Sequence, residues 1–404
     1  MTLTSTRRLG GLALAAMLFV AACGGSSATT APASAAAPTT APTTAPTTAP
    51  ASAAAPSESM AAASPSASAA ALPVPPTASV KLQGAGATFP APLYQQWFDT
   101  YTGLHSNIQF DYTANGSGAG IKAITEGTVD FGASDAAMKD TEIAALPAGV
   151  KVLHVPTALG AVVIIYNVPG VTDLKLDADT VAGMYLGTIT TWNDPKIAAL
   201  NPGVTLPATA ITIVHRSDGS GTTNAFTTYL DTVSPDWHTK VGKGKEVSWP
   251  TGIGSQGNDG VAGSVKQTEG SVGYVELNYA EKAGLTSAAL KNADGQFVAG
   301  STDGVTAAAE AALSTFPADF RQAPIINGAG ATTYPIASYT YLLIPVDWKD
   351  ADKASAMVAF TAWALTDGQA QETALGYAPL PAAVATNALN ELHQVTANGT
   401  PVWP

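Results

Sequence analysis

Short apolar runs alternate with helical patterns through most of the chain. Runs rich in β-branched and aromatic residues, typical of strands, occupy positions 107–114, 150–155, 160–168, 210–216, 271–277 and 339–346. Residues 91–102 place Leu93, Trp97 and Tyr101 on one stripe, which predicts an amphipathic helix. A second helix is predicted over residues 353–365, where Met357, Phe360 and Ala364 share a face. Strands separated by helices indicate an α/β body with largely parallel sheets.

The pattern changes sharply near the N-terminus. Residues 24–79 are nearly all Ala, Thr, Pro and Ser and lack aromatic side chains, so they cannot pack a core. We expect a disordered, extended tether over 23–79. Before it, two Arg residues precede an apolar run that ends in "VAAC" at Cys23. This order resembles a bacterial lipoprotein signal over 1–22, with Cys23 as the lipid attachment site. A plain secretory signal with an incidental Cys is the alternative.

Composition and charge exclude several classes of partner and site. The formal net charge is −12, and there is no long basic run, so we expect no nucleic-acid partner. The single Cys excludes a disulfide within the chain. None of the five His residues is spaced as a ligand pair, so we expect no metal. We also expect no cofactor.

Four glycine-rich turns carry the candidate chemistry. They read "GAGATFPAPLY" from Gly84, "YTANGSGAGIKAI" from Tyr112, "VDFGASDAAM" from Val129 and "RSDGSGTTNAF" from Arg216. Each predicted turn follows a strand or opens a helix, where free N–H groups and the positive end of the helix dipole attract anions. Glycine lets the backbone approach a ligand closely, and Arg216 can add a bidentate contact. Simple helix capping is the alternative function of such turns.

None of these turns matches a nucleotide or hydrolase motif. "GAGATF" lacks the third glycine of G-x-G-x-x-G, and no turn ends in the Gly-Lys-Ser/Thr of a P-loop. "DGSGT" does not fit the G-x-S-x-G nucleophile elbow. A kinase, dehydrogenase or serine hydrolase is therefore disfavoured.

Six separated stretches closely resemble the phosphate-binding lipoproteins that serve bacterial ABC importers. They are "GAGATFPAPLYQQWFDTY", "VDFGASDAA", "MYLGTITTWNDP", "RSDGSGTTNAFTTYL", "GNDGVAGSVKQTEGSVGYVE" and "YAPLP". The resemblance covers about Gly84 to Pro381. It implies a two-lobed α/β fold of the periplasmic-binding-protein type II, with the ligand in the interlobe cleft. We assign 80–160 and 335–404 to lobe I and 161–334 to lobe II.

The resemblance also implies a set of ligand-binding residues. Thr88 and Phe89 match the first loop, Ser117 the second, and Asp135 the carboxylate that accepts a hydrogen bond from the P–OH group of phosphate. Arg216 matches the ligand arginine, with Asp218 as its supporting salt partner. Ser220, Gly221 and Thr222 match the family's donors at the start of a helix.

From this resemblance we expect a monomeric, non-enzymatic protein that binds inorganic phosphate with high affinity. It would deliver phosphate to ABC permease subunits at the outer face of the cytoplasmic membrane, held there by its lipid anchor. A phosphoester hydrolase, binding of another protonated tetrahedral oxyanion, and a surface adhesion role are the alternatives. Sulfate, which has no proton to donate at neutral pH, would be rejected by Asp135.

Overall fold

The computed structural model describes residues 71–404, so the expected signal over 1–22, Cys23 and most of the expected tether lie outside the described residues. Within 71–404, no helix is both long enough and apolar enough to cross a membrane. The last residues of the expected tether contact the body. The side-chain amide of Asn107 donates to the carbonyl groups of Pro76 and Ala78, both at 2.8 Å.

The first part of the body contains a three-stranded parallel group with β1 at its centre. Strand β1 pairs with β2 on one side and with β3 on the other, both in parallel. Helix α1 buries Leu93, Trp97 and Tyr101, as the sequence pattern predicted. The elements are β1 (Val80–Gly86), α1 (Ala91–Leu104), β2 (Ile108–Ala114), α2 (Ser117–Thr125), β3 (Phe131–Ser134) and α3 (Asp140–Ala144).

A second parallel group lies in the middle of the sequence, where β6 pairs with β7 and β8. The elements of this middle part are β5 (Lys175–Leu176), α4 (Ala178–Tyr185), α5 (Pro195–Leu200), β6 (Thr212–Arg216), α6 (Gly221–Val233), α7 (Pro235–Lys240), β7 (Ile253–Ser255), α8 (Gly257–Gln267), β8 (Ser271–Glu276), α9 (Leu277–Ala283), β9 (Thr286–Ser287), β10 (Ala289–Lys291), β11 (Phe297–Val298), α10 (Thr302–Ala312) and β12 (Ile325–Ile326). Strands β5, β10 and β11 form a small sheet of their own.

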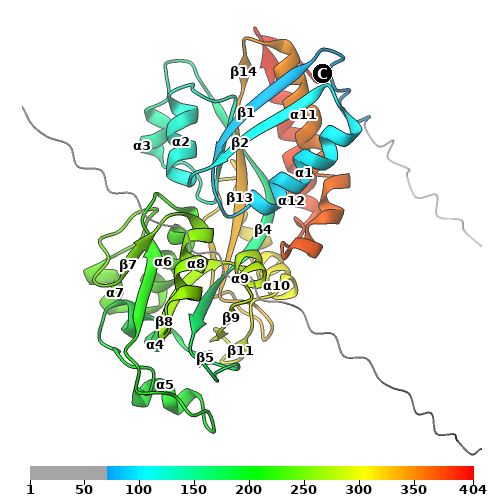
Figure 1. The fold of residues 1–404 in the computed structure, drawn as a ribbon. Helices are drawn as coiled ribbons and strands as arrows, with labels where there is room; N and C mark the ends of the chain where they lie inside the picture. The colour runs from blue at the N-terminus through cyan, green and yellow to red at the C-terminus, as the bar shows by residue number, and fades with distance from the viewer. Residues whose placement is uncertain (1–70) are drawn as a thin grey trace, which may run out of the picture. The chain divides into compact units, whose positions relative to one another are not determined.

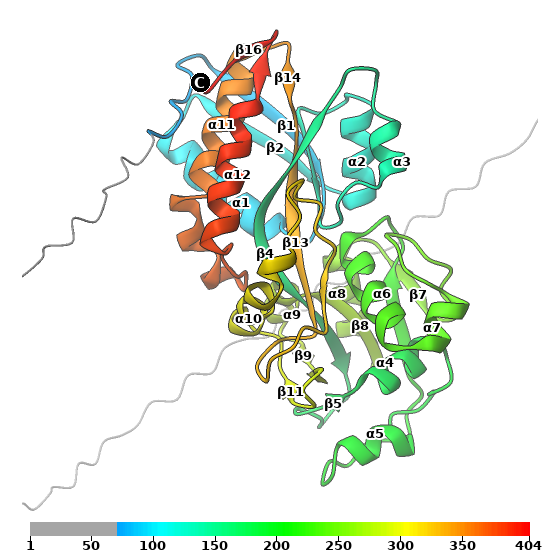
Figure 2. The ribbon, with the colours of Figure 1, turned by 180° about the vertical axis from the view of Figure 1, so that it is seen from behind.

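The C-terminal part returns to the first group. Helix α11 packs against β1 there and buries Met357, Phe360 and Ala364. The elements are β13 (Ile336–Pro345), β14 (Asp347–Trp348), α11 (Ala351–Ala364), α12 (Ala382–Glu391), β15 (Thr396–Ala397) and β16 (Thr400–Pro401). We call the first and last parts together lobe I and the middle part lobe II (Figures 1 and 2).

Two long strands join the lobes. Strand β4 (Val152–Asn167) pairs with β13 up to Ala161 and with β8 from Val162, in both cases antiparallel. The resulting sheet has the order β2-β1-β3-β13-β4-β8-β6-β7. The expectation of largely parallel sheets is therefore correct for β1, β2 and β3 and for β6, β7 and β8. It is wrong for the two connecting strands and for the short pairs β10–β11 and β15–β16, which are antiparallel. The residue boundaries of the lobes remain a prediction.

The sequence pattern predicted two strands where β4 is one. Pro156 and Gly160 break the apolar run, but the register against β13 shifts between Thr340 and Tyr341, which leaves a bulge at Thr157. Proline is tolerated at a bulge because its missing N–H removes no ladder hydrogen bond there. Nearly all of β4 is buried, which explains its continuous apolar character.

Candidate functional site

Loops at the carboxyl ends of five parallel strands meet where the two lobes face each other. Strands β1, β2 and β3 lead to Thr88, Ser117 and Asp135 in lobe I, and β6 and β7 lead to the starts of α6 and α8 in lobe II. Hydrogen bonds between the lobes join these loops. For example, the backbone N–H of Gly221 donates to Ser117 Oγ at 3.0 Å. Ligands in α/β proteins bind at such an edge.

The first loop is fixed through its carbonyl groups. Tyr279 Oη donates to the carbonyl of Thr88 at 2.5 Å, and Tyr377 Oη donates to that of Phe89 at 2.7 Å. The Phe89 ring fills the space over Gly160, where a Cβ would lie 2.6 Å from the ring. Helix α1 begins directly after Pro90, which is its N-cap residue. The carbonyls are thus occupied, and the amide groups of this loop are left to face the site.

Asp135 is the buried carboxylate of the site and is only 3% exposed. Thr340 Oγ1 donates to its Oδ1 at 2.9 Å, and Ser117 Oγ donates to its Oδ2 at 3.3 Å. Burial raises the pKa of Asp135 to about 7, although the hydrogen bond from Thr340 and the charge of Arg216 act against this rise. A carboxyl group with this pKa can accept or donate a hydrogen bond near neutral pH.

Arg216 and Asp218 form a bidentate ion pair. Arg216 Nε donates to Asp218 Oδ1 at 2.7 Å, and its Nη2 donates to Oδ2. The Gly257 amide also donates to Oδ1, at 3.1 Å. Burial opposes ionisation of Asp218, but its hydrogen bonds and charge pairing with Arg216 outweigh this and lower its pKa. The pair holds the guanidinium rigidly, and the remaining nitrogen, Nη1, lies 3.5 Å from Thr222 Oγ1.

The start of helix α6 provides donors at the positive end of a helix dipole. Ser220 is the N-cap, and its Oγ accepts a hydrogen bond from the Thr223 amide at 3.0 Å. The Ser220 amide itself donates to the carbonyl of Lys245 at 3.0 Å, so its hydroxyl hydrogen is what remains for a ligand. Gly221 presses against Asp135: a Cβ built on it would lie 2.5 Å from the Asp135 Cβ.

Several amide groups at this junction have no protein acceptor. Within residues 71–404, no hydrogen bond is formed by the backbone N–H groups of Thr88, Phe89, Ser117 or Thr222. All four residues are buried. Buried N–H groups rarely stay unpaired in folded proteins, and their number here indicates that the site accommodates an acceptor-rich anion.

Sequence reasoning missed two residues of this network. Asn258 is fully buried and donates from Nδ2 to Thr88 Oγ1 at 2.9 Å and to Thr222 Oγ1 at 3.2 Å. It follows the glycine of the "GNDG" stretch, which could have signalled it. Thr340 lies inside an apolar strand, and no pattern in the sequence distinguishes it from a core residue.

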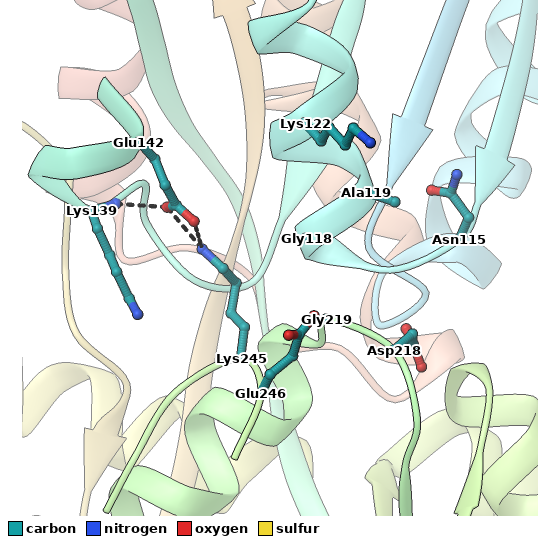
Figure 3. Close-up of a pocket in the computed structure, with 10 residues that line it drawn as sticks. All are labelled: Asn115, Gly118, Ala119, Lys122, Lys139, Glu142, Asp218, Gly219, Lys245 and Glu246. Atoms are coloured by element: carbon teal, nitrogen blue, oxygen red, sulfur yellow. Dashed lines mark hydrogen bonds and ion pairs between the residues drawn. The ribbon is translucent and has the colours of Figure 1, made fainter. Parts of the chain in front are cut away.

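The mouth of the junction is a groove of about 610 Å³ lined by charged residues of both lobes. The Gly118 amide donates to the carbonyl of Gly219 across it at 2.8 Å. Lys245 of lobe II pairs with both carboxylate oxygens of Glu142 in lobe I, at 2.6 and 2.8 Å (Figure 3). The lobes are thus in contact at the site and again at its rim.

Two lobes joined by two strands, with loops from both lobes converging on one site, define a periplasmic-type solute-binding protein. A family model described as "PBP superfamily domain" matches residues 36–367. The chain belongs to this superfamily and, by its curated relatives, to the family of phosphate-binding proteins.

The curated relatives are similar over most of the chain. "Phosphate-binding protein PstS" of Xylella fastidiosa (strain Temecula1) is 42% identical over 307 residues, covering 76% of this chain and 83% of that protein. The protein of the same name from Methanocaldococcus jannaschii is 38% identical over 342 residues, with coverage of 78% and 87%.

Solved structures share the fold. A periplasmic phosphate-binding protein solved with bound phosphate at pH 8.5 aligns with a TM-score of 0.62 and 21% identity, covering 78% of this chain and 99% of that one. A phosphate-binding protein from Stenotrophomonas maltophilia also gives a TM-score of 0.62 with 21% identity, covering 77% and 93%. The expected two-lobed α/β fold is confirmed.

Proposed function

We propose that this protein binds inorganic phosphate between its lobes and delivers it to the permease of an ABC importer. The observation that carries this proposal is the set of buried, unpaired amides around one arginine and one carboxylate. Helices α2, α6 and α8 all begin at this junction, so their dipoles add to the attraction for an anion. The names and the bound phosphate of the relatives support the same ligand.

The ligand residues in this proposal are those expected from the sequence: Thr88, Phe89, Ser117, Asp135, Arg216, Ser220, Gly221 and Thr222. The unpaired amides of Thr88, Phe89, Ser117 and Thr222, the hydroxyls of Thr88, Ser220 and Thr222, and the guanidinium donate to the phosphate oxygens. Gly221 contributes by letting the two lobes approach closely. Asp218 supports the site by orienting Arg216. Because Asp218 balances the charge of Arg216, local dipoles supply much of the stabilisation, and an acidic protein can bind an anion.

Asp135 provides selectivity. Phosphate near neutral pH carries at least one proton, which it can donate to the carboxylate. Sulfate has none, so an ionised Asp135 would face it with two acceptors opposed, at a cost of about 3 kcal/mol or more. Attraction therefore comes from Arg216 and the amides, and discrimination comes from Asp135.

The proposal includes a lipid anchor at Cys23. The signal-like segment over 1–22 supports attachment there, at the outer face of the cytoplasmic membrane. The Ala/Thr/Pro/Ser-rich segment over 23–79 would then act as a spacer between anchor and body. We propose that the protein acts as a monomeric carrier without enzymatic activity, which is in keeping with relatives that are named for phosphate binding.

Calorimetric titration of residues 71–404 with phosphate, arsenate and sulfate tests this function. We expect binding of phosphate and arsenate and little binding of sulfate. R216A should weaken phosphate binding at least about hundredfold, because it removes the cation and leaves Asp218 buried without its partner. K81A, which removes an exposed cation whose ion pair with Asp111 lies within lobe I, is the control. Undetectable phosphate binding by the unsubstituted protein would contradict the proposal, and phosphate ester hydrolysis would favour a hydrolase.

A further inference from the structure

Asn258 lies between the two threonines of the site and belongs to helix α8 of lobe II. Its backbone N–H and its Nδ2 both donate to Thr88 Oγ1, at 3.2 and 2.9 Å. The second hydrogen on Nδ2 is directed to Thr222 Oγ1, at 3.2 Å. Thr88 belongs to lobe I and Thr222 to lobe II, so one amide group connects the lobes at the centre of the site.

The orientation of the Asn258 amide is determined by its other end. Its Oδ1 accepts a hydrogen bond from the backbone N–H of Glu276 at 3.0 Å. A backbone N–H is always a donor, so the oxygen of the side chain must face Glu276. The NH₂ group must therefore face the two threonines, and the reverse orientation would oppose two donors.

This orientation decides the direction of the threonine hydroxyls. A hydroxyl oxygen has two lone pairs and one hydrogen. Both lone pairs of Thr88 Oγ1 are taken by N–H groups of Asn258. Those of Thr222 Oγ1 are taken by Asn258 Nδ2 and, at the longer distance of 3.5 Å, by Arg216 Nη1. The hydroxyls of Thr88 and Thr222 can therefore interact with a ligand only by donating their hydrogen.

Ser117 follows the same rule in the second loop. Its Oγ accepts from the amides of Gly221 and Asp135, at 3.0 and 3.2 Å. Its single hydrogen donates to Asp135 Oδ2 at 3.3 Å, so Ser117 offers a ligand its backbone amide. The hydroxyls of the site thus act as donors because N–H groups of the protein occupy their acceptor positions. A ligand with only acceptor oxygens at these points fits, and a ligand that offers a hydrogen there does not.

We propose that Asn258 is a positioning residue for specificity, which fixes Thr88 and Thr222 as obligate donors and does so for Thr88 only when the lobes meet. This inference rests on the proposed phosphate site. Because Thr88 and Asn258 come from different lobes, closure orients the Thr88 hydroxyl at the moment when the anion is enclosed. The Thr222 hydroxyl, which lies in the same lobe as Asn258, is oriented before the anion arrives, and a donor pre-organised in this way adds affinity without a reorganisation cost at the time of binding.

Two substitutions of Asn258 test the proposal by calorimetric titration with inorganic phosphate. N258L removes both side-chain donors and leaves the hydroxyls free to rotate, so the Kd should rise about tenfold or more. N258D keeps the shape but offers an acceptor to both threonines, which reverses their hydroxyls and adds a negative charge. Its Kd should rise about a hundredfold or more, above that of N258L. N387D, on the exposed face of α12, is the matched control.

A background without the two hydroxyls separates positioning from a purely structural role. In T88V/T222V, a residue that acts through these hydroxyls has nothing left to orient. Adding N258L to this background should therefore change the phosphate Kd by less than about threefold. A purely structural contribution of Asn258 would persist there with its full size. Thermal melts identify any variant that fails to fold, and N258D, which is isosteric, provides the comparison if N258L does so.

The outcomes distinguish the inference from the proposed function. If the unsubstituted protein binds phosphate and N258L binds it equally well, the positioning role is wrong and the function stands. The same conclusion follows if N258D binds as tightly as N258L, or if N258L costs as much in the T88V/T222V background as alone. If the unsubstituted protein binds no phosphate, the proposed function itself is wrong.

Discussion

Gly221 of lobe II and Asp135 of lobe I are packed so closely that a methyl group on Gly221 would lie 2.6 Å from Asp135 Oδ2. Gly221 is the first residue of helix α6, and its φ is not in the left-handed region. Glycine is therefore required here by the approach of the opposite lobe and not by the backbone. This contact explains why a residue that disfavours helices begins one.

G221A should hinder closure of the two lobes without lowering the thermal stability of the fold. Alanine is compatible with the first turn of α6, so the melting temperature should be unchanged or higher. The lobes could not approach fully, and phosphate affinity should fall about 10- to 100-fold, as expected for overpacking of about 1–3 kcal/mol. Calorimetry and thermal melts measure both effects. G263A, at a helical glycine with open space around it, is the control. Unchanged affinity in G221A would show that this contact is absent when phosphate is bound.

Rejection of sulfate should depend on pH. Because the pKa of Asp135 is raised to about 7, mainly by burial, the carboxyl group gains a proton as the pH falls through this value. A protonated Asp135 can donate to sulfate, so sulfate affinity should increase about tenfold for each pH unit below the pKa. D135N should bind sulfate with little dependence on pH while retaining phosphate binding.

Competition titrations over pH 5–8 (about two units below and one above the pKa) measure this dependence. D294N, at an exposed aspartate of lobe II, is the control and should behave as the unsubstituted protein. Sulfate affinity that stays constant with pH in the unsubstituted protein would remove Asp135 from this role.

The ion pair at the rim should control the lifetime of the complex. Lys245 and Glu142 have side chains that are only 10% and 26% exposed, so their pairing across the lobes is partly shielded from water. E142Q should weaken closure by about 1 kcal/mol and increase the phosphate dissociation rate about fivefold. Stopped-flow measurements test this. E126Q, in the exposed pair with Lys122 at the end of helix α2, should have no effect, and an equal acceleration there would contradict the assignment.

Glu372 should make the body less stable at high pH. It is fully buried, its Oε2 has no hydrogen-bond partner within the described residues, and burial raises its pKa well above 4.5 despite the hydrogen bond from Gln369. The folded state therefore holds a proton that the unfolded state releases above about pH 4.3. The free energy of unfolding therefore falls as the pH rises from the unfolded-state pKa of about 4.3 towards the raised pKa of Glu372 in the folded state.

E372Q should remove this loss of stability. We expect an increase of about 1–3 kcal/mol in the free energy of unfolding near pH 8 and a small change near pH 4. Urea denaturation at both pH values measures it, with the exposed E310Q as control. An equal effect at both pH values would mean that Glu372 acts through packing and not through its proton.

The sequence identified the turns that meet between the lobes, but it did not predict the course of the connecting strand. Thr88, Ser117 and Asp135 could be found because glycine-rich turns after strands are a local signal, and the structure brings these turns together. Their role in binding stays a prediction. Thr340 could not be found, because its partner Asp135 is 205 positions away and its surroundings are those of a core strand. Long-range pairing of this kind leaves no local pattern.

Strand β4 was predicted as two strands for a physical reason. Pro156 and Gly160 are ordinary strand breakers, and only the bulge against β13 allows β4 to continue through them. A bulge is a property of two paired strands, so the sequence of β4 alone does not reveal it. Helix α1, whose stripe is set by its own residues, was predicted with nearly its full length.

The bulge at Thr157 links the two strands that join the lobes to the buried carboxylate of Asp135. Thr157 Oγ1 donates to the carbonyl of Thr340 at 3.2 Å, and the hydroxyl of Thr340 donates to Asp135. Both threonines lie on the two strands that must twist when one lobe rotates against the other. A torsion of this connection therefore reaches the Asp135 carboxylate through Thr340 alone. Bending of the hinge and protonation of this carboxylate are therefore expected to influence each other.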